Sequence, residues 1–231
     1  MPEPELRFPA GFLFGAATAA YQIEGHTQAD GRGESIWDRF CKVPGAIEEG
    51  VNGERACDHY ARWEQDIELM VELGLKAYRY SVAWPRILPQ GRGAVNTKGL
   101  DFYELLTDRL LQKGIKPSLT LYHWDLPQVL QEKGGWLNRD VVKWFEEYVD
   151  VCARRFGDRV KNWMVLNEPL SFTLAGYMLG MHPPGYISFS KFYKSIHHVA
   201  LSQAAGGRVL RANLKNANIG TTFSCLPVDP Y

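Results

Sequence analysis

Short apolar runs alternate along this chain with longer segments in which apolar residues recur at helical spacing. Runs of this kind, closed by polar residues or a proline, are typical of buried parallel strands. The alternation therefore predicts a parallel sheet whose strands are joined by right-handed helical crossovers. The predicted strands are residues 12–17, 77–84, 116–122, 161–168 and 218–225.

Helical periodicity predicts the connecting helices, together with a short helix near residues 36–40. Gly74 and Gly114 follow two of them as C-caps, and Asn138 is expected to cap the N-terminus of a third. The stretch from residue 25 to 57 has little periodicity and is predicted to be a loop that covers a site. The main predicted helices span residues 58–73, 100–113, 138–155 and 190–213.

This order of elements predicts a (β/α)₈ barrel, an α/β fold in which one face, at the carboxyl ends of the strands, carries the active site. The whole chain, residues 1–231, is expected to form a single domain. Only about the first five β/α units are visible, whereas a complete barrel of this kind typically needs ~250 residues or more. We therefore expect the N-terminal portion of a barrel.

The fourth predicted strand ends in the sequence Asn167–Glu168–Pro169. Pro169 cannot donate to a sheet ladder, so the strand should end at or before it and leave Asn167 and Glu168 at the catalytic face. A carboxyl group walled by aromatic residues would have a raised pKa and could act as a general acid. The alternative is a glutamate that only caps the next helix or pairs with an arginine. The stretch alone favours neither interpretation.

Other hydrogen-bonding side chains also fall at or just after predicted strand ends, namely Gln22, Arg79, His123 and Trp124. Each has an ordinary structural explanation, such as a loop amide, a buried ion pair or a core histidine. Together with Asn167 they place amide, imidazole and indole groups around one carboxylate. This set suits a neutral polyhydroxylated ligand.

Composition excludes several other classes of protein. Lysine plus arginine balance aspartate plus glutamate at 26 each, so nothing indicates a nucleic-acid or anionic-membrane partner. The four cysteines form no metal-ligand pattern, and no metal or cofactor is expected. We interpret them as reduced thiols, and residues 1–7 lack the pattern of a secretion signal, so we expect a cytoplasmic protein.

Four ordered motifs resemble glycoside hydrolase family 1, and most closely its β-glucosidases. They cover almost the whole chain and are specific in combination. The motifs are residues 12–25 (FLFGAATAAYQIEG), 78–87 (YRYSVAWPRI), 121–128 (LYHWDLPQ) and 166–169 (LNEP).

The resemblance implies a retaining β-glycosidase that acts on β-glucosides or cello-oligosaccharides. Glu168 matches the family's general acid/base, and Asn167 matches the residue that binds the sugar 2-hydroxyl. In such enzymes two carboxyl groups ~5–5.5 Å apart act as nucleophile and acid/base.

The remaining matches concern substrate binding and orientation. Gln22 and His123 match ligands of the glycone hydroxyls, and Trp124 matches the adjacent wall of the sugar site. Arg79 matches the arginine that orients the nucleophile. The form of residues 124–128 resembles enzymes for unphosphorylated sugars rather than 6-phospho-glycosidases.

The chain departs from the family pattern in one large respect, because no Ile/Val-Thr-Glu-Asn-Gly nucleophile motif occurs in it. The leading hypothesis is an acid/base half that is inactive alone and needs the remaining strands from the same full-length chain, a second fragment or another copy. The alternatives are a family-1-like pseudoenzyme and a half-barrel, either of which would bind sugar or a partner without hydrolysis. Gly206 and Gly207 are also unexpected inside a predicted helix, where each costs ~1 kcal/mol.

Overall fold

The computed structural model describes residues 7–225, so the expectation for the first residues of the chain lies largely outside it. The described residues contain one five-stranded parallel sheet in the order β1-β2-β3-β4-β5. Sequential neighbours therefore pair throughout, as the alternating pattern predicts. The strands are β1 (Gly15–Ala17), β2 (Ala77–Ser81), β3 (Lys116–Tyr122), β4 (Asn162–Asn167) and β5 (Asn218–Thr222).

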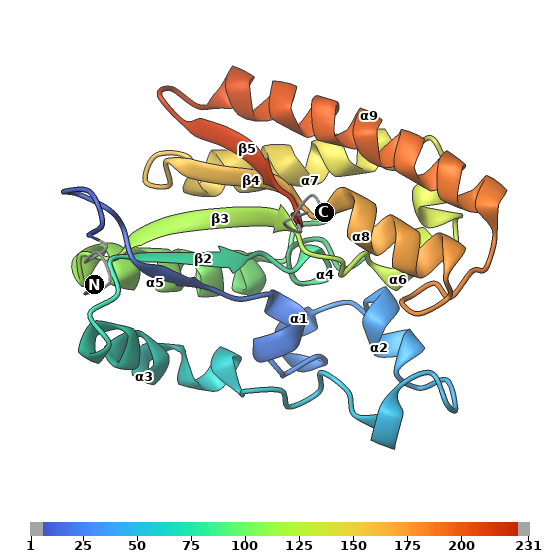
Figure 1. Cartoon of the computed structure of the whole chain (residues 1–231), viewed down its shortest axis with the longest axis horizontal. Coiled ribbons are helices and arrows are strands. Elements are labelled where there is room, and N and C mark those ends of the chain that lie inside the picture. The colour runs from blue at the N-terminus through green and yellow to red at the C-terminus, as the bar shows by residue number, and fades with distance from the viewer. Residues whose placement is uncertain (1–6, 226–231) are drawn as a thin grey trace, which may run out of the picture.

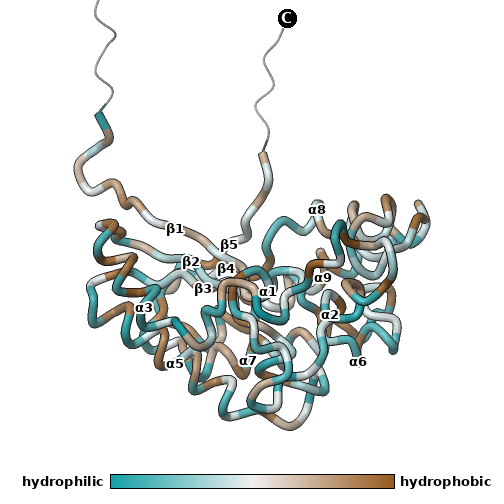
Figure 2. Tube along the Cα trace, turned by 90° about the horizontal axis from the view of Figure 1, so that it is seen from below, coloured by the Kyte–Doolittle hydropathy of each residue, from teal (hydrophilic) through white to brown (hydrophobic). Residues whose placement is uncertain are grey.

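Helices connect the strands and cover one face of the sheet (Figures 1 and 2). Helices α3, α5 and α7 lie on one side of it in Figure 2, and α9 packs against β4 and β5. Among residues 7–225, no helix covers the opposite face of the sheet. The long helices are α3 (His59–Glu72), α5 (Thr97–Gln112), α7 (Val141–Phe156) and α9 (Phe189–Asn213).

Short elements follow most strands at their carboxyl ends. They are α1 (Ala20–Ile23), η1 (Ala29–Gly31), α2 (Ile36–Phe40), η2 (Glu48–Gly50), α4 (Trp84–Ile87), α6 (Gln128–Gln131), η3 (Gly135–Leu137), α8 (Pro169–Thr173) and the π-helical turn η4 (Leu174–Met178). Helix α2 confirms the short helix predicted inside the long loop. Its N-cap Ser35 forms a capping box with Asp38, which explains why the helix begins there.

A buried tyrosine ties the carboxyl ends of β2 and β3 to the helix layer. The Tyr148 hydroxyl on α7 lies 2.9 Å from the Val82 carbonyl and 2.8 Å from the Leu121 carbonyl. Its ring stacks on Trp84 with 4.8 Å between centroids and 9° between planes. Aromatic packing thus fixes the carboxyl ends of β2, which contains Arg79, and of β3, which His123 follows, relative to each other.

Some predicted boundaries are wrong, and each has a local cause. Strand β2 ends at Ser81, because Trp84 begins α4 with Pro85 in its first turn, where a missing N–H does no harm. Helix α7 begins at Val141 with Asp140 as N-cap. Asn138 instead accepts a bond from the Asp140 N–H at 2.9 Å and forms a turn before the helix.

Other elements differ from the prediction only in where they begin or end. Strand β1 begins at Gly15, three residues later than predicted, and α5 begins three residues earlier, at Thr97. Strand β5 ends at Thr222. The predicted C-cap glycines, Gly74 and Gly114, both adopt φ +72°, the left-handed conformation of that position.

Of the two glycines inside α9, the first, Gly206, is explained by packing. A Cβ on Gly206 would lie 2.9 Å from Phe145 Cε1 on α7 and 3.0 Å from Val165 Cγ1 on β4. Helix α9 therefore approaches both elements more closely than any side chain would permit. At Gly207 a Cβ would meet only the end of Arg211, at 3.4 Å.

Candidate active site

Side chains from β2, β3 and β4 meet at the carboxyl ends of these strands, around Asn167. Arg79 Nη1 donates to Asn167 Oδ1 at 2.9 Å, and Asn167 Nδ2 lies 3.2 Å from His123 Nε2. The Trp124 indole donates to the Asn167 carbonyl at 2.8 Å. Asn167 itself is only 2% exposed. Four of the residues singled out from the sequence thus form one hydrogen-bonded group.

Glu168 follows directly, in an unusual backbone conformation. It has φ 48° and ψ 65°, and its N–H donates to the Thr222 carbonyl of β5 at 2.8 Å. Trp124 also has a positive φ, of 78°. Left-handed backbone is unfavourable for residues with a Cβ, by ~1–3 kcal/mol, and persists only where the surroundings impose it. The surroundings therefore hold Glu168 and Trp124 in strained conformations, directly after Asn167 and His123 in the chain.

The two ordinary interpretations of Glu168 receive no support from its contacts. Glu168 occupies the N-cap position of α8, but its side chain makes no capping hydrogen bond. Within residues 7–225 its carboxylate forms no ion pair, although it lies near enough to Arg79 to affect that guanidinium electrostatically. The half-buried carboxylate is therefore free to act on another group.

Burial and charge determine the ionisation of the neighbours. Burial lowers the pKa of the Arg79 guanidinium, and the Glu168 carboxylate opposes that shift. Burial, with a smaller contribution from Arg79, lowers the pKa of His123 to about 4. His123 is consequently neutral near pH 7, which favours hydrogen bonding to uncharged groups over ion pairing.

The hydrogen-bonded chain also determines the orientation of the amide and the imidazole. Arg79 can only donate, so Asn167 must present its oxygen to Arg79 and its NH₂ to His123. Neutral His123 then accepts through Nε2 and carries its proton on Nδ1, which is buried and has no partner among the described residues.

A cavity of about 370 Å³ opens beside this group. Gln22 from α1 lines it together with His123 and Trp124, so the structure brings this predicted residue to the same place. Asn167, Glu168 and Arg79 do not belong to its lining. Asn167 adjoins it through its hydrogen bonds with His123 and Trp124, Arg79 hydrogen-bonds to Asn167, and Glu168 follows Asn167 in the chain.

Sequence reasoning missed two further residues that line this cavity, Trp37 and His182. The His182 ring lies 5.1 Å from the Trp37 ring and 5.3 Å from the Trp124 ring, measured between centroids. Neither residue follows a strand, so the strand-end pattern could not find them. The available signals were the tryptophan in the predicted helix at 36–40 and the histidine before two prolines.

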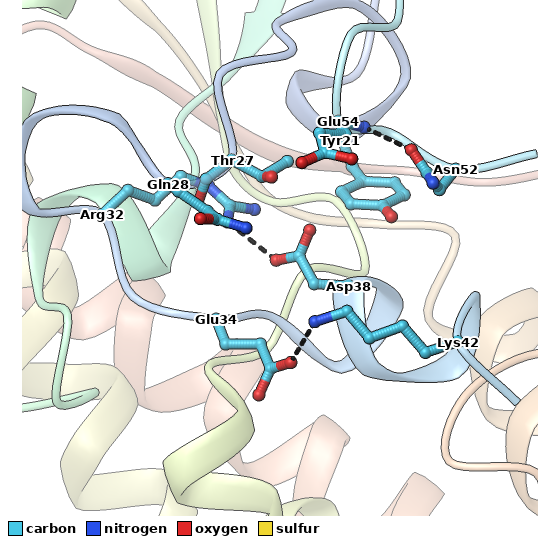
Figure 3. A pocket seen from close by; sticks show the side chains of 9 residues that line it. All are labelled: Tyr21, Thr27, Gln28, Arg32, Glu34, Asp38, Lys42, Asn52 and Glu54. Atoms are coloured by element: carbon cyan, nitrogen blue, oxygen red, sulfur yellow. Dashed lines mark hydrogen bonds and ion pairs between the residues drawn. The ribbon is translucent and has the colours of Figure 1, made fainter.

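A second cavity, of about 310 Å³, shares Tyr21 and Asn52 with the first (Figure 3). Four of its charged groups already satisfy one another: Arg32 pairs with Asp38 at 2.7 Å and Lys42 with Glu34 at 3.0 Å. A ligand there would have to displace these internal bonds. The first cavity, with its neutral polar groups, is the better candidate site.

Two other kinds of feature do not occur in the described part of the chain, residues 7–225. No helix there is both long and apolar enough to span a membrane. No group of three or more histidine, cysteine, aspartate or glutamate side chains in that range could hold a metal ion.

Parallel strands joined by helices, with polar side chains brought to one site at the strand ends, define the class of fold: the described chain forms five strands and four long connecting helices of a (β/α)₈ barrel. The fold predicted from the sequence is thereby confirmed. The chain belongs to glycosyl hydrolase family 1, whose family model matches residues 5–231.

Relatives and solved structures agree with this membership. Beta-glucosidase A of Thermotoga maritima is 51% identical over 94% of this chain and 49% of its own length, and 1,4-beta-D-glucan glucohydrolase of Thermotoga neapolitana is 50% identical over 94% and 51%. The aryl-phospho-beta-D-glucosidase BglC of Bacillus subtilis is 47% identical over 96% and 47%. The structure of the Thermotoga maritima β-glucosidase in complex with deoxynojirimycin superposes with a TM-score of 0.92 at 51% identity, covering 94% of this chain and 49% of that one. The chain thus spans about half the length of the curated relatives it matches.

Proposed function

We propose that this chain forms the acid/base half of a retaining β-glucosidase, with residues 1–231 belonging to one barrel domain and Glu168 as general acid/base. The observation that carries the proposal is the Glu168 carboxylate, which has no ion-pair partner in the described part of the chain and adjoins the hydrogen-bonded group of Arg79, Asn167 and His123. The names of the relatives support β-glucosides or cello-oligosaccharides as substrates.

In the proposed reaction a nucleophilic carboxylate attacks the anomeric carbon while Glu168 protonates the departing glycosidic oxygen. Glu168 then removes a proton from water, which attacks the glycosyl-enzyme and releases the sugar with retained configuration. The nucleophile comes from the barrel strands that these 231 residues do not include. Desolvation by substrate and the approach of a second carboxylate would favour the protonated form of Glu168 that the first step requires.

The surrounding residues hold the sugar in this proposal. Gln22 and His123 bind glycone hydroxyls, Trp124 forms the adjacent wall, and Asn167 binds the 2-hydroxyl. Arg79 orients the nucleophile. The neutral state of His123 supports this role, since a sugar hydroxyl carries no charge that would need a cationic partner.

We propose an unphosphorylated sugar as the substrate. The described residues that line the cavity include no lysine or arginine, the side chains on which a phosphate usually depends. BglC, whose name indicates a phosphorylated substrate, is nearly as similar as the other relatives. A comparison of glucoside with 6-phosphoglucoside hydrolysis would decide between the two substrates.

The partner we propose is the remaining part of the barrel, supplied by the same full-length chain, a second fragment or another copy. The uncovered face of the sheet and the outer strands β1 and β5 support this proposal. We propose a cytoplasmic location, supported by four cysteines that are all free thiols in the described residues.

The test compares wild type with Glu168→Ala in the protein with its barrel completed. An acid contributes most when the departing oxygen is basic, so hydrolysis of alkyl glucosides should fall by about 10²–10⁴-fold and that of dinitrophenyl glucosides much less. Azide should restore part of the lost rate by attacking the intermediate without a base. Glu64→Ala, on the exposed side of α3, is the matched control and should leave the hydrolysis rates of both substrates unchanged. Equal losses for both substrates without azide rescue would remove the acid/base role from Glu168.

A further inference from the structure

Gln22 reaches the cavity from an unusually small element. Helix α1 has only four residues and no side-chain cap, and so short a helix is not stable by itself. At its N-terminal end the Ala20 N–H donates to the buried Ser81 hydroxyl on β2 at 2.8 Å. Something must likewise hold the other end if Gln22 is to keep one position.

That end carries a buried ion pair. Glu24, two residues after Gln22, is 4% exposed, and Arg86 is 0% exposed. Arg86 donates from Nε and Nη2 to the same oxygen, Glu24 Oε2, at 3.0 and 2.9 Å. Tyr103 on α5 donates to the other oxygen, and the Arg86 guanidinium lies 4.0 Å from the centre of the Tyr60 ring.

Stability alone does not explain the pair, because buried ion pairs often stabilise a fold no more than apolar side chains of the same size would. Burial lowers the pKa of Arg86, but Glu24, Tyr103 and Tyr60 together more than offset this, so the guanidinium lies charged against the Glu24 carboxylate at 2.9 Å. Three donors on two oxygens allow the carboxylate one orientation. Such geometry restrains the backbone that carries it.

We propose that the Glu24–Arg86 ion pair is a positioning element for Gln22, holding its side chain where it meets the hydroxyls of the sugar. This inference rests on the proposed β-glucosidase function. Glu24 and Arg86 do not contact the substrate in this proposal, and they act only by holding Gln22 in place. Misplacement of a binding group by ~1 Å can lower a rate by up to about 100-fold.

The test is a double-mutant cycle in the protein with its barrel completed, using p-nitrophenyl β-D-glucoside. The pair is replaced by Glu24→Gln with Arg86→Met, which leaves no unpaired buried charge. We expect kcat/KM to fall about tenfold in the wild-type background and less than twofold when Gln22→Ala is already present, because coupled residues are not additive. The ratio of alkyl to dinitrophenyl glucoside rates should not change, since Glu168 is untouched. Equal losses in both backgrounds would overturn the inference.

Two further measurements separate this inference from a general loss of structure and from failure of the proposed function. Glu104→Gln removes the ion pairs that Glu104 of α5 makes with Arg155 and Arg159 without touching α1, and it should leave kcat/KM unchanged. Hydrogen exchange over residues 19–25 should become at least about tenfold faster in the pair variant, while α7 keeps its protection. If the wild type hydrolyses no glucoside, the proposed function fails, and the exchange experiment still decides the positioning role. Unchanged exchange over α1 would then overturn it.

Discussion

Asp125 offers a sharp test of how burial acts next to the site. This residue follows His123 and Trp124, is 1% exposed, and has no hydrogen-bond partner for either carboxylate oxygen within the described residues. Burial raises its pKa to about 8. The positive charge of Arg32 opposes this rise, and the negative charges of Glu24 and Asp38 add to it more weakly. The substitution Asp125→Asn replaces the carboxyl group by a neutral group of the same shape.

The expected gain in stability depends on pH in a defined direction. In the unfolded chain the carboxyl group titrates near 3.8, so at pH 7 only the folded protein binds the proton. Between pH 3.8 and about pH 8, each pH unit lowers the free energy of unfolding by about 1.4 kcal/mol, which amounts to about 4 kcal/mol at pH 7. This cost grows as pH rises from 3.8 to about 8 and disappears when both states are protonated. Asp125→Asn should therefore stabilise the fold by up to about 4 kcal/mol at pH 7 and hardly at all at pH 4.

The assay is urea unfolding followed by tryptophan fluorescence at pH 4, 5.5 and 7, in the protein with its barrel completed. Asp140→Asn is the matched control, since its carboxylate is 60% exposed and lies 3.7 Å from Lys143 in a weak surface pair. The control should show a difference below about 1 kcal/mol at each pH. A stability difference for Asp125→Asn that is the same at all three pH values would refute the reasoning.

The remaining predictions concern the reaction, the isolated chain and the packing of α9. In the completed enzyme, NMR of the anomeric proton should show the β-anomer first, and initial release of the α-anomer would disprove retention. Residues 1–231 alone should not hydrolyse a chromogenic β-glucoside above buffer, because the nucleophile motif is absent, and turnover abolished by Glu168→Gln would contradict this. The same isolated chain should sediment as associated species or melt without a sharp transition, since the outer strands and side chains such as Phe12 and Phe14 are exposed; a monomer with a cooperative melt would show otherwise. Gly206→Ala should destabilise the completed protein by about 1–3 kcal/mol in urea, as its methyl group collides with the core, whereas Gly207→Ala should be neutral or gain up to about 1 kcal/mol. Equal effects at the two glycines would contradict the packing argument.

The order and type of the main elements could be predicted because hydrophobic periodicity is a local property of the chain. Strand β3 and the helix at residues 36–40 have the predicted bounds. The end of β2 and the cap of α7 could not be predicted in this way. They depend on where Pro85 can be tolerated and on which acceptor the Asp140 N–H finds once the turn has formed.

For the site, the sequence by itself determined which residues stand at strand ends, since the carboxyl ends of parallel strands share one edge of a sheet. His123, Trp124, Asn167 and Glu168 gather there as expected, whereas Arg79 lies in the middle of β2 and reaches them through its bond to Asn167, and the motifs indicated their family. Only the tertiary structure decided what no local pattern encodes. It brought loop residues distant in sequence to the same cavity, made His123 neutral by burial, and left the Asp125 carboxyl group without a hydrogen-bond partner among residues 7–225. The physical reason is that burial, electrostatic environment and the choice of hydrogen-bond partner depend on neighbours that meet only when the chain has folded.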